Sequence, residues 1–216
     1  MARRKNKRDS KLDRYILIAD GETEQWYVEL LKKHYNLRIK IKPELSPVSI
    51  KEQYNIVRRS IDEGFGHVFW IIDFDRIMKE NRESQNENVV LRYFENYYQK
   101  AKSESKLADK LTIIINNPCF EYWFYLHGNP TSTKHFASYN DLLPELRKFK
   151  VDANLFANYA KSEKCYTGNG GIYEKLLPYL QRIDFGKLKS FDFRSCQRQG
   201  VSEMYKLFVG LGINKK

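Results

Sequence analysis

The sequence has few cysteines, no long apolar run and no excess of negative charge. Its three cysteines, Cys119, Cys165 and Cys196, show no paired spacing, which argues against a disulfide framework and against a structural zinc site. No apolar stretch approaches the ~18 residues that are needed to cross a bilayer. The basic N-terminus lacks the apolar core of a secretory signal. We therefore expect a soluble cytoplasmic protein without membrane association.

Positive charge dominates the chain and is concentrated at its N-terminus. The 216 residues include 38 Lys and Arg against 27 Asp and Glu, a formal net charge of +11 at pH 7. Residues 1–14 are too polar to order themselves, so we expect a basic flexible arm that contacts the phosphates of nucleic acid. The alternative is a solvated tail that only aids solubility. The basic residues expected to bind nucleic acid are Arg3, Arg4, Lys5, Lys7 and Arg8.

Short apolar segments alternate with amphipathic ones in the first 127 residues. Residues 15–19, 67–72 and 111–115 are strongly apolar runs, which are typical of strands buried on both faces of a parallel sheet. Apolar residues at helical spacing predict helices between these strands. The predicted helices cover residues 23–35, 48–63 and 89–103, with a more exposed strand at 37–41 and a polar loop that follows Asp75 and runs through Glu87.

This alternation predicts an α/β fold, with a mostly parallel sheet and flanking helices. We place this core at residues 15–127, after the arm at residues 1–14. Residues 128–216 are expected to form a mainly helical C-terminal extension packed on the core, with helical patterns near 141–149, 172–183 and 201–211.

Each of the three apolar strands ends in polar side chains. Asp20 and Glu22 follow the first, Asp73 and Asp75 the second, and an Asn-Asn pair the third. Ligands of open α/β sheets bind outside the carboxyl ends of the strands. Carboxylates gathered there repel each other unless a cation lies between them, and Mg²⁺ prefers oxygen ligands. We therefore predict a metal site at this edge of the sheet.

The Asp-x-Asp spacing has its own geometry. If the segment is extended, Asp73 and Asp75 share one face while Phe74 points inward. The alternative is that each Asp only terminates a strand or caps the element that follows.

Two motifs resemble those of known families. Asp20-Gly-Glu-Thr-Glu24 after a buried strand, with Ile71-Ile-Asp-Phe-Asp75, resembles the Toprim domain, a Mg²⁺-binding fold of topoisomerases, primases and nucleases. The segment Asn116-Asn-Pro-Cys-Phe-Glu-Tyr-Trp-Phe-Tyr-Leu-His127 is similar to the signature of the RloB-like family. Members of this family are small Toprim-related proteins encoded near restriction and phage-defence loci. The resemblance covers residues 15–127 well and the C-terminal part more loosely.

The resemblance implies a Toprim-like core and a metal-dependent nuclease of anti-phage defence that hydrolyses DNA or RNA with Mg²⁺ or Mn²⁺. A defence-system protein would be a further partner. The alternative is a non-catalytic nucleic-acid-binding or sensor subunit, because Asp20 stands where Toprim domains usually have Glu. The catalytic candidates are Asp20, Glu22, Asp73 and Asp75, and the metal candidates are Asp20, Asp73, Asp75 and Glu121.

Overall fold

The computed structural model describes residues 15–42, 48–85, 88–148, 178–180, 186, 188–196 and 198–213. The basic arm, with Arg3, Arg4, Lys5, Lys7 and Arg8, lies outside the described residues, as does most of the helical pattern predicted at 172–183. Among the helices of the described part, none combines the length and the apolarity that crossing a bilayer requires.

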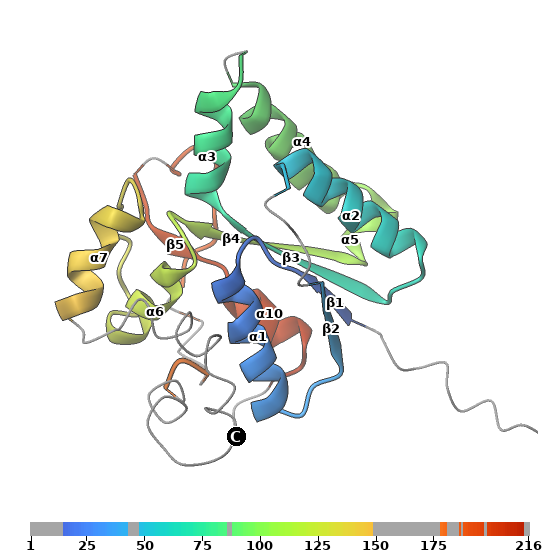
Figure 1. Ribbon diagram of the computed structural model, residues 1–216, viewed down its shortest axis with the longest axis horizontal. Coiled ribbons are helices and arrows are strands. Elements are labelled where there is room, and N and C mark those ends of the chain that lie inside the picture. The colour runs from blue at the N-terminus through green and yellow to red at the C-terminus, as the bar shows by residue number, and fades with distance from the viewer. Residues whose placement is uncertain are drawn as a thin grey trace, which may run out of the picture.

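A five-stranded sheet in the order β2-β1-β3-β4-β5 forms the centre of the molecule (Figure 1). Four strands are parallel: β1 (Tyr15–Ile18), β2 (Ile39–Lys42), β3 (His67–Asp73) and β4 (Leu111–Asn117). The short β5 (Val201–Ser202) pairs antiparallel with the end of β4, so the sheet includes a strand from the C-terminal part of the chain. This arrangement confirms the predicted α/β class with a mostly parallel sheet.

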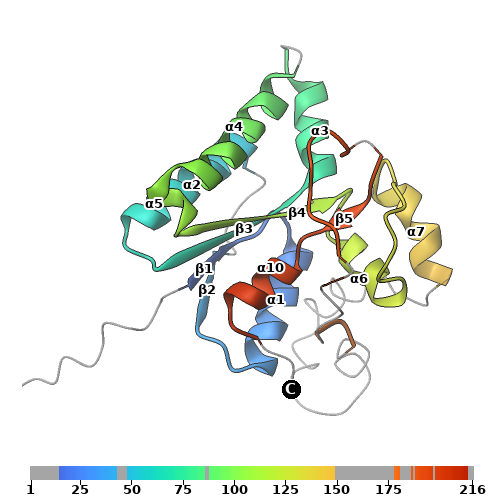
Figure 2. The same cartoon turned by 180° about the vertical axis from the view of Figure 1, so that it is seen from behind.

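Helices cover both faces of the sheet, as the two opposite views show (Figures 1 and 2). Each face has its own apolar core. The helices that contribute to one core are α1 (Glu22–His34), α6 (Glu121–Gly128), α7 (Tyr139–Lys148) and α10 (Tyr205–Gly210). Those that contribute to the other are α2 (Ile50–Asp62), α3 (Phe74–Glu83), α4 (Val89–Ser103) and α5 (Ser105–Ala108).

Successive strand residues pack into different cores. Leu17 and Phe69 contribute to one core, and Ile16 and Trp70 to the other. Side chains alternate between the two faces of a strand, so a strand covered on both faces needs an apolar residue at every position. This requirement explains why the three central strands are continuous apolar runs.

The segment after β3 differs from the prediction. The predicted polar loop is wrong, because α3 begins at Phe74 and runs to Glu83. Only Phe74, Ile77 and Asn81 are buried in this helix. Because charged residues separate them, the sequence does not show an obvious helical spacing of apolar residues. The extended Asp-x-Asp geometry is also wrong: Asp73 is the N-cap residue, and Asp75 lies in the first helical turn.

The predicted helix at 201–211 is confirmed only in part. Val201 and Ser202 form β5, and α10 begins at Tyr205. Gly200, just before β5, lies so close to its neighbours that a Cβ there would be 2.3 Å from the Lys134 carbonyl oxygen and 2.5 Å from the Tyr122 ring. A glycine is therefore required where the chain returns to the sheet.

Candidate functional site

The carboxyl ends of β1, β3 and β4 bring acidic side chains together. Asp20 follows β1, and the backbone of Asp73, the last residue of β3, lies near enough to the Asp20 carboxyl group to act on its pKa. Asn116 of β4 donates from Nδ2 to Asp73 Oδ1 at 3.4 Å. The register pairs Asp73 with Asn116, so both residues reach the same edge of the sheet. The ends of three strands therefore meet as predicted.

Four of the predicted site residues interact electrostatically in this cluster: Asp20, Asp73, Asp75 and Glu121. Glu22 begins α1, but its side chain is outside the described part of the structure. A further acid, Glu24, takes the place that we expected for Glu22. It is buried in α1 and is repelled first by Glu121 and then by Asp20.

Burial and mutual repulsion raise the pKa of these carboxyl groups. The pKa of Asp73 is raised well above its ordinary value, mainly because the carboxyl group is buried. Repulsion by four neighbouring acids raises it further, and Glu24 has the largest effect of the four. Burial and the nearby Glu121 and Asp20 raise the pKa of Glu24 to about 8. Burial and the same two neighbours raise the pKa of Asp75 to about 6. Ionising all of these groups together is therefore unfavourable unless a cation lies among them.

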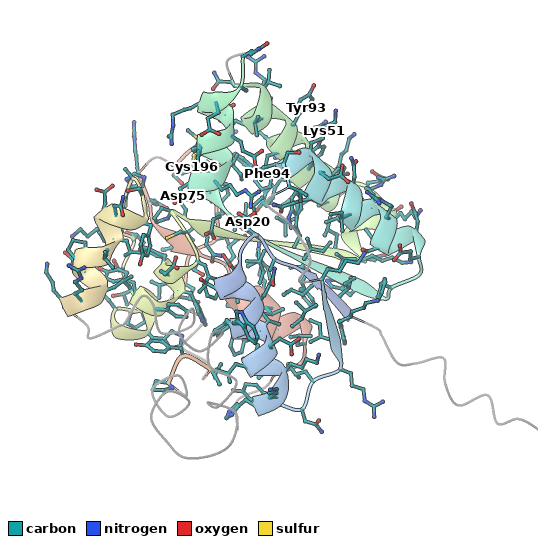
Figure 3. The ribbon with its side chains drawn as sticks, in the orientation of Figure 1. Asp20, Lys51, Asp75, Tyr93, Phe94 and Cys196 are labelled. Atoms are coloured by element: carbon teal, nitrogen blue, oxygen red, sulfur yellow. The ribbon has the colours of Figure 1, made fainter. Side chains whose placement is uncertain are left out.

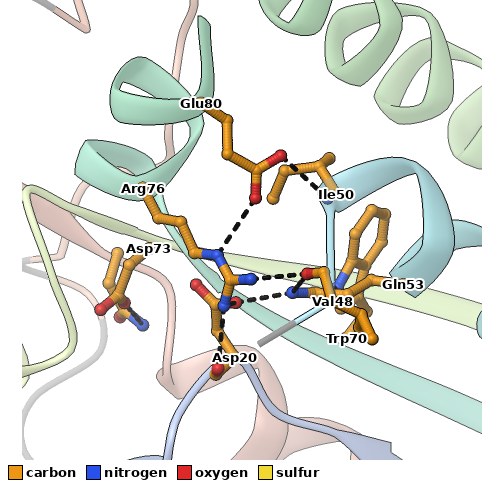
Figure 4. Close-up of polar contacts among 9 residues, drawn as sticks. Asp20, Val48, Ile50, Gln53, Trp70, Asp73, Arg76 and Glu80 are labelled. Carbon is orange, nitrogen blue, oxygen red and sulfur yellow. Dashed lines mark hydrogen bonds and ion pairs between the residues drawn. The ribbon is translucent and has the colours of Figure 1, made fainter. Parts of the chain in front are cut away.

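Asp20 is held by two polar side chains from other elements (Figure 4). Arg76 of α3 forms an ion pair with its carboxylate and also donates to its backbone oxygen at 3.1 Å. Gln53 of α2 donates from Nε2 to Asp20 Oδ1 at 2.6 Å, and Trp70 donates to Gln53 Oε1 at 2.7 Å. Burial raises the pKa of Asp20 above its usual value, although Arg76 and Gln53 lower it.

Arg76 is fixed in turn by the start of α2 (Figure 4). Its Nε lies 3.3 Å from Glu80 Oε1, and its Nη2 donates to the Val48 carbonyl oxygen at 2.5 Å. Glu80 Oε2 accepts the backbone N–H of Ile50 at 3.1 Å. The Arg76 guanidinium thus joins the end of β1, the first turns of α3 and the residues that lead into α2.

The acids fit a divalent cation in chemistry but not in placement. Across the described ranges, no three Asp, Glu, His or Cys side chains are arranged to bind one metal ion together. Asp20 directs Oδ1 at Arg76 and Gln53, so this oxygen is already engaged. The donors are nevertheless all carboxylates, the ligands that Mg²⁺ prefers, and a cation would relieve the repulsion that raises their pKa values. The metal-binding role of these residues stays a prediction.

The two asparagines that end β4 are oriented by the C-terminal segment. Asn116 is fully buried, and its Oδ1 accepts from Ser202 Oγ at 2.6 Å. Asn117 donates from Nδ2 to the carbonyl oxygens of Cys196 at 2.6 Å and Gln199 at 2.7 Å. Cys196, Gln199 and Ser202 therefore fix the polar end of β4 and belong to the scaffold of the site.

The sequence did not identify Arg76 or Gln53 as site residues, and it predicted only that Glu24 lies at the start of a helix. A signal was present for two of them. Glu24 lies three and four positions before the buried Tyr27 and Val28, and Gln53 lies within the apolar stripe of α2. A polar residue on a buried helical face needs a partner or a function. Arg76 gave no such signal, because it follows Asp75 in a charged segment.

A family model described as RloB-like protein matches residues 15–189 of the chain. The matched range contains β1 to β4 and all the acidic residues of the cluster. No curated protein and no solved structure matches the chain.

Proposed function

Because the chain belongs to the RloB-like family, we propose that it is a metal-dependent nuclease that hydrolyses phosphodiester bonds of DNA or RNA in anti-phage defence. One observation carries the proposal: carboxyl groups gathered near the ends of three strands, with Glu24 buried and the others half-buried, interact closely enough to raise each other's pKa. Such a cluster is costly for folding unless it serves a cation or a proton transfer. The α/β fold with a mostly parallel sheet is consistent with a Toprim-like core.

In this proposal Asp73, Asp75 and Glu121 would close around Mg²⁺ or Mn²⁺ when the ion binds, because their side chains are not arranged as a set of ligands without it. When bound, the ion would polarise a phosphoryl oxygen and lower the pKa of a bound water. Glu24 is the chain's own candidate for moving a proton, because its pKa of about 8 lies close to neutral pH. Asp20 is a positioning residue in this proposal, because Arg76 and Gln53 already occupy Oδ1. Glu22 stays a catalytic candidate from the sequence alone.

The basic arm would hold the phosphate backbone without reading bases. Arg3, Arg4, Lys5, Lys7 and Arg8 would provide this contact, which weakens as salt rises.

A second candidate is a non-catalytic nucleic-acid-binding or sensor subunit of a defence system. The observation that favours it is the ion pair of Asp20 with Arg76, because it engages an acid that a Toprim nuclease would use in its chemistry. A partner protein would then supply the catalytic step.

Purified protein incubated with single-stranded DNA, duplex DNA and RNA in Mg²⁺ or Mn²⁺ tests the proposal. We expect cleavage by the wild type and at least about a hundredfold loss in Asp73→Asn, because a metal ligand would be removed. Asp109→Asn is the matched control, since Asp109 is an exposed acid in the turn before β4. Binding without cleavage, across all metals and substrates, would support the non-catalytic subunit.

A further inference from the structure

A pocket of about 180 Å³ lies directly beside the carboxylate cluster. Asp75 belongs to both, and Figure 3 places it next to Cys196, another lining residue, where α3 meets the sheet. Whatever fills this pocket would therefore contact the cluster through Asp75. The pocket is built from α3, the end of β4 and residues 135–137 and 196, four parts of the chain that meet only in the fold.

The size of the pocket limits its occupant to one small ring. Engineered protein cavities of about 150 Å³ bind benzene, so 180 Å³ admits a six-membered ring with its substituents but not a base pair. Apolar surface from Phe74, Met78 and Cys196 lines it, and the Phe74 ring packs at an angle of 52° against that of Phe191, with ring centroids 4.9 Å apart. Such walls suit the flat face of a nucleobase.

Three polar side chains besides Asp75 line the pocket. Arg82 and His135 make no hydrogen bond or ion pair with any other residue of the described ranges, so both are available to a ligand. Asn117 uses its Nδ2 on two backbone carbonyls, so its side-chain oxygen is the group that can accept from a ligand. Arginine and histidine donate to phosphate, whereas an amide oxygen accepts from a ring N–H or an exocyclic amine.

We propose that this pocket binds one unstacked pyrimidine nucleotide of a single-stranded nucleic acid, with its ring among Phe74, Met78 and Cys196 and its phosphate at Arg82 and His135. The inference rests on the proposed function, because it places the neighbouring phosphodiester at the carboxylate cluster. A single strand is the favoured substrate, since a base in a duplex must first leave its stack and its partner to enter the pocket.

Fluorescence anisotropy of labelled oligonucleotides tests the pocket without cleavage when Ca²⁺ replaces Mg²⁺. The probes are thymidylate and adenylate strands of about ten nucleotides, the uridylate RNA, and a duplex of the same length. We expect the pyrimidine strands to bind about fivefold more tightly than adenylate, because the larger purine does not fit. The duplex should bind more weakly than either single strand.

Ala137→Trp tests the assignment directly, because Ala137 is exposed and lines the pocket, so that an added indole would fill it. We expect about a tenfold loss of thymidylate affinity, the worth of one stacked base. The matched control is Asn140→Trp, which adds the same side chain at an exposed position of α7 outside the lining. Arg82→Gln is a second variant that keeps the pocket open; it should lower the affinity of every strand and keep the pyrimidine preference.

Wild-type affinity in a folded Ala137→Trp, or tighter binding of the duplex, overturns the pocket assignment. The two proposals fail separately. If the protein cleaves in Mg²⁺ but Ala137→Trp does not change its binding of single strands, the nuclease proposal stands and the pocket assignment is wrong. If Ala137→Trp abolishes selective binding of single strands but the protein cleaves no substrate, the pocket assignment stands and the nuclease proposal is wrong.

Discussion

The carboxylate of Asp20 is ion-paired with the guanidinium of Arg76, a residue 56 positions later in the sequence. The pair is mostly buried: 4% of the Asp20 side chain and 21% of the Arg76 side chain are exposed. A buried charge without its partner is far more costly than the intact pair is stabilising. The pair therefore joins the end of β1 to α3 at the position where the carboxylates meet.

Arg76→Ala should lower the free energy of unfolding by about 3 kcal/mol, because it leaves Asp20 buried without a cation. The matched control is Arg59→Ala, whose partner Glu52 lies 2.8 Å away in an exposed pair; that loss should stay below about 1 kcal/mol. Urea unfolding measures both. Equal losses in the two variants would show that burial does not determine how much the Asp20–Arg76 pair contributes to the free energy of unfolding.

Glu24→Gln should stabilise the protein at pH 8 and leave it unchanged at pH 4. The folded pKa of Glu24 is raised from 4.5 to about 8, so the folded state keeps a proton that the unfolded state has lost. Stability therefore falls as pH rises between these two values, and an uncharged Gln avoids the loss. Urea midpoints at pH 4, 6 and 8 measure the effect.

Glu29→Gln is the control for this pH series, because Glu29 lies on the same helix with 34% of its side chain exposed. It should follow the wild type at all three pH values. A Glu24→Gln protein that also follows the wild type would contradict the repulsion inferred for the cluster.

Adding Mg²⁺ should raise the thermal midpoint at pH 8, where the cluster carries more negative charge than at pH 5. A site with a Kd of about 1 mM stabilises by about 1.4 kcal/mol at 10 mM ion, which corresponds to about 3–5 °C for a chain of this size. Chelation should remove the shift. Asp73→Asn should lose it, whereas Asp109→Asn should keep it; an identical shift in both variants would point to nonspecific ion binding.

The sheet could be predicted from the sequence, but the partners of the acids could not. Strands buried on both faces must be apolar throughout, so β1, β3 and β4 were visible as runs. The carboxyl ends of parallel strands lie at the same edge of a sheet, so the order of the elements was enough to predict that Asp20 and Asp73 lie close together. By contrast, β5 has two residues, too few to show any period.

The ion pair of Asp20 depends on the direction in which α3 leaves β3. Arg76 reaches Asp20 because the helix begins at Phe74; in an extended segment its side chain would lie on the face opposite Asp75. Likewise, Gln53 reaches Asp20 only because α2 packs over β1 and β3. These contacts are set by the packing of elements far apart in the chain, which local periodicity does not encode.

His127 should make the protein sensitive to acid. It lies in α6 with its ring 4.8 Å from that of Trp123, and its buried Nε2 has no hydrogen-bond partner in the described structure. Burial lowers the pKa of His127 from 6.5 to about 4. The unfolded state therefore binds the proton first, so this contribution to stability is present above about pH 6.5 and is lost as pH falls toward 4.

Replacing His127 by Phe should remove this loss, which amounts to at most about 3 kcal/mol for a difference of 2.5 pKa units. The difference in unfolding free energy between wild type and His127→Phe, followed from pH 7 to pH 4, isolates His127 from the acids, whose pKa shifts act in the opposite direction. His34→Phe at the exposed end of α1 is the control and should keep the wild-type pH dependence. A difference that stays constant with pH would show that His127 does not lose its proton on burial.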